Sequence, residues 1–265
     1  YPGMPVPSPA LVTLLAALVL AGGDVAAAPA PAPATLDPAR VGWSEIRMTA
    51  SKLFMSAEAR LTLRTVPGSS VMPDLLPVPA TFSPLVPGAE VLELVYEAGG
   101  LGRQSSITLL MDPRSGAALQ RVQHDKQGKL RLRTWRFGTD GAYHRTRRPA
   151  ARDEETLQTP RWTKVEEGLR VYPEDTGETP VVEPTGLLYA LAAASLDRPG
   201  DSLEVLVFRR RDTQLVHAEV LEPRDVSVHY DELWPKGAVQ RRGRMKPIRI
   251  SIEGRPVPGA DPDDD

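Results

Sequence analysis

The sequence contains no cysteine, and aromatic residues make up only 5% of its 265 residues. The absence of cysteine excludes disulfides, thiol catalysis, cysteine-ligated zinc and lipid attachment at a cysteine. None of the four histidines forms an HxH or HxxxH pair, and neither a G-x-S-x-G elbow nor a phosphate-binding glycine loop is present. We therefore expect no cofactor, no metal and no enzymatic activity. A hydrolase with a dispersed catalytic site stays an alternative.

A hydrophobic run long enough to cross a membrane is also missing. The longest apolar run, residues 11–21, has the length of a signal-peptide core, and the small residues 25–28 after it fit a cleavage site. We predict a signal peptide over residues 1–27 and a soluble periplasmic or secreted mature protein without a transmembrane segment. An uncleaved anchor or a buried helix is the alternative. Residues 28–34 alternate alanine and proline, and we predict an extended tether over residues 28–40.

Charge is unevenly distributed, although the net charge is only −2. Residues 121–152 hold ten basic and two acidic residues, and residues 153–183 hold nine acidic and three basic ones. In one interpretation the two blocks neutralise each other. In the other, the basic strands form a surface for a polyanion or for an envelope protein partner. That surface would comprise Arg131, Arg133, Arg136, Arg145, Arg147 and Arg148. We expect no nucleic-acid partner, because the sequence pI is about 6.2.

The remaining sequence is typical of a sheet protein. Residues 57–64 alternate apolar and polar side chains, the pattern of a half-buried strand. Similar segments predict about eleven further strands, which lie near 43–50, 90–96, 106–111, 118–124, 129–137, 142–146, 203–208, 215–221, 226–230, 239–242 and 248–252. Residues 67–88 contain six prolines and are predicted to be a loop or insertion. Residues 149–183 are predicted to be a long connection.

One helix is predicted over residues 187–196, rich in alanine and leucine and capped by Thr185. It is apolar nearly all round and should be buried against a sheet. The fold class that satisfies these elements is mainly β or α+β, a curved antiparallel sheet wrapped around one buried helix. We expect a single domain over residues 41–253. Residues 254–265 form an acidic tail, which is either natural or marks a chain cut before further strands.

Three features carry a resemblance to a known architecture. They are the hairpin of residues 43–64, the hairpin of residues 137–143, and residues 187–208, where a buried helix leads through Pro199-Gly200-Asp201 into a strand. Over residues 41–253 the chain resembles the periplasmic half-barrel proteins of the lipoprotein-carrier (LolA-like) fold, in particular an uncharacterised exported bacterial family. The resemblance implies a concave sheet, closed by a helix, that holds acyl chains. The chain departs from the family in the long 67–88 insertion, and we expect it to lack the closing strands after Ile252.

The candidate ligand-binding residues are apolar side chains expected to face that concavity. A packed core without a ligand is the alternative for the same residues, and an incompletely filled half-barrel would leave an apolar pocket. On this basis we expect a non-enzymatic envelope protein that binds a lipid or another apolar ligand; an interaction or structural module that docks a partner is the second hypothesis. The candidates are Leu61, Leu63, Leu92, Leu94, Leu130, Leu132, Leu187, Tyr189 and Leu191.

Overall fold

The computed structural model describes residues 35–257 except 53–54, 101–102, 127–129, 174–178, 210–211, 235–236 and 246. Within these residues the fold is mainly β, with a large antiparallel sheet and few helices, which confirms the fold class expected from the alternating segments. No sheet in this part of the chain closes on itself, so the half-barrel is not confirmed. The predicted signal peptide, residues 28–34 and residues 258–265 lie outside the described residues.

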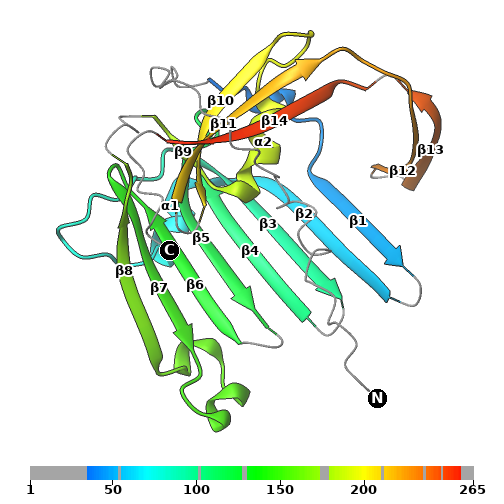
Figure 1. Ribbon diagram of the computed structural model, residues 1–265. Helices are drawn as coiled ribbons and strands as arrows, with labels where there is room; N and C mark the ends of the chain where they lie inside the picture. The colour runs from blue at the N-terminus through cyan, green and yellow to red at the C-terminus, as the bar shows by residue number, and fades with distance from the viewer. Residues whose placement is uncertain are drawn as a thin grey trace, which may run out of the picture.

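Eight consecutive strands form the large sheet, in which each strand pairs antiparallel with the next along the chain (Figure 1). The edges are β1 and β8. Because short connections suffice between antiparallel neighbours, consecutive strands can pair directly, and directly opposite residues share one face of the sheet. The strands are β1 (Glu45–Lys52), β2 (Met55–Pro67), β3 (Glu90–Gly100), β4 (Arg103–Met111), β5 (Ala118–Asp125), β6 (Arg131–Phe137), β7 (Gly141–Arg148) and β8 (Lys164–Val171).

A second sheet of four strands has the order β14-β11-β10-β9, and a separate hairpin consists of β12 and β13. In the second sheet β9 runs parallel to β10, and the other neighbours are antiparallel. Figure 1 shows this sheet over one end of the large sheet and the hairpin extending away from it. These strands are β9 (Val181–Val182), β10 (Ser202–Arg209), β11 (Asp212–Leu221), β12 (Val226–Trp234), β13 (Gly237–Met245) and β14 (Arg249–Pro256).

The predicted buried helix is present but shorter than expected. Thr185 does not cap it: the helix has no side-chain cap at its N-cap residue Gly186. The Glu183 carboxylate instead caps the 3-10 turn before the helix, where it accepts a hydrogen bond from the Thr185 backbone N–H at 2.7 Å. Tyr189, Ala190 and Ala193 are its buried residues. The helices are α1 (Gly68–Val71), α2 (Leu187–Ala193) and the 3-10 turns η1 (Pro38–Arg40), η2 (Met72–Asp74), η3 (Arg152–Thr156), η4 (Thr159–Arg161) and η6 (Pro184–Gly186). No helix among the described residues is long and apolar enough to cross a membrane.

The main core lies between α2, the four-stranded sheet and one face of the large sheet. Leu94, Tyr189 and Val216, one from each of these three elements, are all at most 2% exposed and belong to one contiguous cluster. We call the face of the large sheet that contributes to this core the inner face and the opposite one the outer face. Burial of this much apolar surface is the main stabilising term of the fold.

The prediction that residues 149–183 are only a connection was wrong, since the segment contains β8 and β9. Strand β8 is exposed along most of its length, and Glu167 interrupts the row of Val165, Leu169 and Val171 on one of its faces, which weakens the alternation. In contrast, residues 67–88 have no strand of their own, in agreement with their proline content. Val71 and Leu85 of this segment pack on Val91 and Leu110, and so cover part of the outer face.

The ends of the folded body extend beyond the predicted limits. Leu36 falls within the predicted tether, yet it is 2% exposed and part of the main core. The backbone N–H of Asp37 also donates to Ala193 O at 2.9 Å. At the other end Val257, assigned to the tail, is 4% exposed. Each is an isolated apolar residue among polar or proline-rich neighbours, too short a signal for a sequence pattern to detect.

Candidate functional site

The strand register places a row of side chains across the inner face that changes from apolar to polar. The pairs Leu61↔Tyr96, Tyr96↔Ile107, Ile107↔Gln123 and Gln123↔Arg133 connect β2 to β6. Directly opposite residues of adjacent strands lie on the same face. Tyr96 and Ile107 are half-buried, and Arg133 is buried at 7% exposure. Along this row, therefore, an apolar half of the inner face on β2–β4 meets a polar half on β5 and β6, while Trp135 and Phe137 at the other end of β6 belong to the core.

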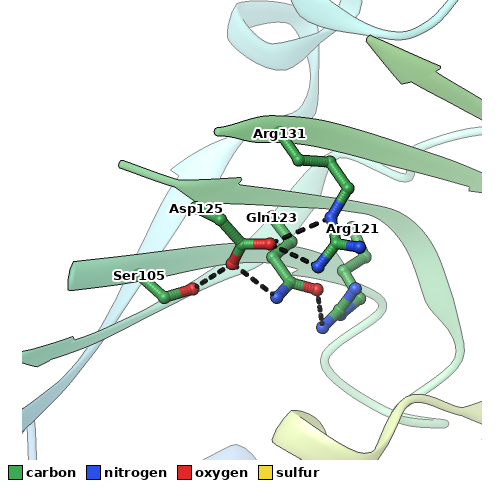
Figure 2. A network of polar contacts seen from close by, with 5 residues as sticks. All are labelled: Ser105, Arg121, Gln123, Asp125 and Arg131. Carbon is green, nitrogen blue, oxygen red and sulfur yellow. Dashed lines mark hydrogen bonds and ion pairs between the residues drawn. The ribbon is translucent and has the colours of Figure 1, made fainter. Parts of the chain in front are cut away.

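The polar half is held by a hydrogen-bond network centred on Asp125 (Figure 2). Asp125 Oδ1 accepts from Ser105 Oγ at 2.9 Å and from Gln123 Nε2 at 3.0 Å. Its Oδ2 accepts from Arg131 Nε at 3.0 Å and Nη2 at 2.7 Å. Arg121 Nη2 donates to Gln123 Oε1 at 3.0 Å. Asp125 thus accepts four hydrogen bonds, so all the acceptor sites of its carboxylate are occupied by other side chains of the chain.

A second ion pair joins this network to the segment leading into α2. Arg121 Nε lies 2.7 Å from Glu183 Oε1, and these side chains are 15% and 6% exposed. Because the same Glu183 caps the turn before α2, the pair ties the helix to β5. Both Arg121 and Arg131 therefore have a carboxylate partner from the chain itself.

Arg133 differs from these two arginines. It lies on the inner face across from Gln123 on β5 and Thr146 on β7. No hydrogen bond or ion pair joins its guanidinium to another residue that the structure describes. A buried charge without a counter-charge costs several kcal/mol. An anion bound beside Arg133 would offset that cost, which makes this position the strongest candidate for contact with a ligand.

The apolar half of the inner face is only partly filled by the core. Ile46, Leu63 and Tyr96 are half-buried and pack against the main core, as are Leu187, Leu188 and Leu191 of α2. Burial raises the pKa of the Tyr96 hydroxyl, so this side chain stays neutral at physiological pH. These residues form an uncharged surface that extends from the edge of the core toward Arg133.

The nine apolar candidates do not form one surface. Leu61, Leu92, Leu94 and Tyr189 are at most 3% exposed and belong to the packed core, while Leu63, Leu187 and Leu191 are half-buried at its margin. Leu132 was expected on the same face as these residues, but the register pairs it with His124 and Arg147 on the outer face. Leu130 lines a cavity on that outer face. Trp135 and Phe137 fill the inner positions of β6 instead.

The six basic candidates are likewise divided between the faces. Arg131 and Arg133 lie on the inner face. Arg136 was expected on a basic surface, but it is 3% exposed, and its guanidinium donates to the backbone oxygens of Leu119 and Leu85 under the 67–88 segment. Burial also lowers the Arg136 pKa.

The other three arginine candidates contact the acidic block of residues 153–183. Arg145 pairs with Glu167 and Arg148 with Glu166, while Arg147 Nη1 donates to Pro160 O at 3.4 Å. Together with Arg121 and Glu183, these contacts join the basic block to the acidic block. They favour the interpretation in which the two blocks neutralise each other.

A cavity of about 490 Å³ lies on the outer face, between β5 and the segment that follows β7. His124 Nε2 lies 3.2 Å from Thr159 Oγ1, and its ring lies edge-on to Trp162 with centroids 6.0 Å apart. Trp162 Nε1 donates to Glu154 O at 3.1 Å. Leu130, Leu157 and Lys126 also line the cavity. The lining mixes apolar and polar side chains without a buried unpaired charge, so it is a weaker site than the inner face.

The half-buried position of His124, beside Thr159, predicts that the stability of the fold depends on pH. Burial lowers the pKa of His124, Lys126 lowers it further, and Asp125 opposes the shift. The unfolded chain therefore takes up a proton more readily, and stability falls as pH decreases from about 6.5 through the folded-state value. Urea unfolding between pH 7.5 and 5 should show a steeper loss in the wild-type protein than in His124→Gln, whose amide can still contact Thr159. Parallel profiles would contradict this role of His124.

No group of three or more histidine or carboxylate side chains among the described residues is placed to hold a metal ion. His217 Nδ1 lies 3.2 Å from Glu204 Oε1 on the four-stranded sheet, and no serine or threonine hydroxyl hydrogen-bonds to this pair among these residues. Sequence reasoning missed Ser105, Gln123, Asp125 and Glu183, although Arg121, Gln123 and Asp125 recur at the spacing of one strand face.

Comparisons with protein-family models, curated proteins and solved structures gave no match.

Proposed function

We propose that this protein binds an amphiphile with an anionic head group on the inner face of its large sheet, without catalysing a reaction on it. The observation that carries this proposal is the row from Leu61 to Arg133, in which half-buried apolar side chains meet a buried arginine that lacks a partner in the described chain. A carboxylate or phosphate head group beside Arg133 would form a charge-assisted hydrogen bond.

The dimensions of the row suit a long apolar tail. Four strand spacings separate β6 from β2, which corresponds to roughly 19 Å. Along this path the ligand would pass Gln123, Ile107 and Tyr96 before it reaches the margin of the core at Leu61. Its apolar part would cover surface that is half-buried, and each methylene removed from water contributes about 0.8 kcal/mol.

The N-terminal sequence supports placing this activity outside the cytoplasm, where the expected signal peptide would direct the chain. The resemblance of residues 41–253 to the lipoprotein-carrier fold supports an acyl-chain ligand. The alternative, an envelope module that docks a partner through its basic strands, has less support. Arg145 and Arg148 are already paired with glutamates, and Arg136 is buried.

Replacing Arg133 by glutamine should weaken the binding of an anionic amphiphile about tenfold or more, because it removes a charge-assisted hydrogen bond. The fluorescent fatty acid cis-parinaric acid is a suitable probe, titrated into the full-length protein. Arg64→Gln is the matched control, since Arg64 is exposed on the outer face and paired with Glu93. Without ligand, Arg133→Gln should be at least as stable as the wild type, because the substitution removes an unpaired buried charge.

Two results would contradict the proposal. One is a wild-type protein that takes up no probe. The other is an equal loss of affinity in Arg133→Gln and Arg64→Gln, which would show that the buried arginine is not the contact.

A further inference from the structure

The last strand of the large sheet, β8, leaves one edge without a partner in the described part of the chain. All eight of its residues pair with β7, in unbroken register from Gly141↔Val171 to Arg148↔Lys164. Figure 1 places β8 at the left margin of the sheet. It contains no proline. The backbone N–H and C=O groups of this edge are therefore available to another strand.

β8 combines exposed apolar side chains with four charged ones. Val165, Leu169 and Val171 are 41%, 51% and 71% exposed on the outer face. On the inner face Arg170 is exposed and makes no ion pair with another described residue. Soluble proteins normally protect a long regular edge with charges, proline or a bulge. Here three exposed apolar residues accompany two cations without an ion pair to another described residue, Lys164 and Arg170. The two glutamates of the strand pair with arginines of β7.

The sequence of β8 is complementary to itself in one antiparallel register. Two copies related by a two-fold axis perpendicular to the sheet pair one residue with itself at the centre. With Gly168 at the centre, Glu166 lies opposite Arg170 of the second copy, although it also pairs with Arg148 of its own chain. Val165 lies opposite Val171 of the second copy, and symmetry forms each pair twice. Opposite charges and β-branched residues in directly opposed positions both stabilise a sheet.

The neighbouring symmetric registers are less favourable. With Glu167 at the centre, two glutamates oppose each other and Lys164 faces Arg170 of the second copy, which is repulsive. With Leu169 at the centre, no opposite charges meet. Gly168 also suits the central position, because a Cβ there would lie only 2.7 Å from His144 Cε1. The His144 ring thus covers the inner side of Gly168, and no side chain of residue 168 opposes its symmetry mate.

We propose that β8 pairs antiparallel with β8 of a second copy of this chain, with Gly168 opposite Gly168, so that two large sheets become one continuous sheet. The axis perpendicular to the sheet leaves both inner faces on the same side of the dimer. This proposal is independent of the ligand proposed above, because β8 contributes no residue to the row that ends at Arg133.

Charge reversal provides a register-specific test. In Arg170→Glu, Glu166 faces a glutamate of the second copy, and in Glu166→Arg the two facing residues are arginines. Each variant should dimerise about tenfold or more weakly than the wild type in sedimentation velocity, since two attractive pairs become repulsive. An equimolar mixture of the two variants restores both pairs and should dimerise again as a heterodimer. Arg161→Glu is the control, a charge reversal at another exposed arginine.

Circular dichroism shows whether each variant is folded; if Arg170→Glu is not, Arg170→Gln removes the attraction at the same position. A wild-type protein that stays monomeric over the accessible concentration range would overturn the proposal. So would a wild-type dimer that Arg170→Glu leaves unchanged, or a mixture of the two variants that fails to associate.

Discussion

Replacing Phe208 by alanine is expected to lower the free energy of unfolding by about 3–5 kcal/mol. Phe208 lies on β10 and is 5% exposed. Its ring contacts Trp135 and Phe137 of β6 at centroid distances of 5.2 and 5.6 Å, and Tyr172 at 6.0 Å. The residue therefore connects the four-stranded sheet to the large sheet, and its truncation would leave a cavity between them.

Urea unfolding followed by circular dichroism measures this loss. Phe208→Leu is the matched control, because it keeps most of the apolar volume and should cost only about 1 kcal/mol. A loss below about 1 kcal/mol in Phe208→Ala would contradict the assignment of this residue to a shared core. So would separate unfolding transitions of the two sheets already in the wild type, because one contiguous core predicts a single transition.

Replacing Tyr189 by alanine should be comparably destabilising, at about 3–5 kcal/mol. Tyr189 is fully buried on α2, and its hydroxyl donates to the backbone oxygen of Pro113 in the turn between β4 and β5. Burial is the largest cause that raises the pKa of Tyr189 to about 12, so the hydroxyl keeps its proton at physiological pH. The side chain thereby fixes α2 against the large sheet.

The variant Tyr189→Phe separates packing from hydrogen bonding. It keeps the ring and loses one hydrogen bond, and should cost about 1 kcal/mol. Hydrogen exchange should show lower protection of the α2 amides in Tyr189→Ala than in Tyr189→Phe. If the two variants were equally destabilised, the hydrogen bond rather than the packed ring would hold the helix.

Alternation along single strands predicted most of the large sheet, because one face of each strand is buried. It failed at β8, where Val165, Leu169 and Val171 are exposed and no buried face marks the strand. Alternation also does not determine which face of β6 is the inner one. The arginines of β6 were expected on the outside and Leu132 on the inside, but Trp135 and Phe137 share a face with Arg131 and Arg133 and turn it toward the core.

The candidate site depended on this choice of face. Arg133 was selected for its charge as part of an exposed basic block, yet it is buried beside the apolar half of the sheet. Its neighbours Gln123 and Ile107 come from other strands, and only the register brings them into line. Sequence alone provides the residue types but not the pairing between strands, so it could not distinguish Arg133 from Arg145, which a glutamate on β8 neutralises.

The most direct test of the proposed function is native mass spectrometry of the full-length protein mixed with three probes: palmitate, hexadecanol and acetate. Palmitate has both the charge that Arg133 requires and the tail that fits the apolar row. The two other probes each have one of these features. We predict a one-to-one palmitate adduct that is much weaker in Arg133→Gln, with little or no adduct of hexadecanol or acetate. No palmitate adduct, or equal binding of palmitate and hexadecanol, would contradict an anionic amphiphile site on the inner face.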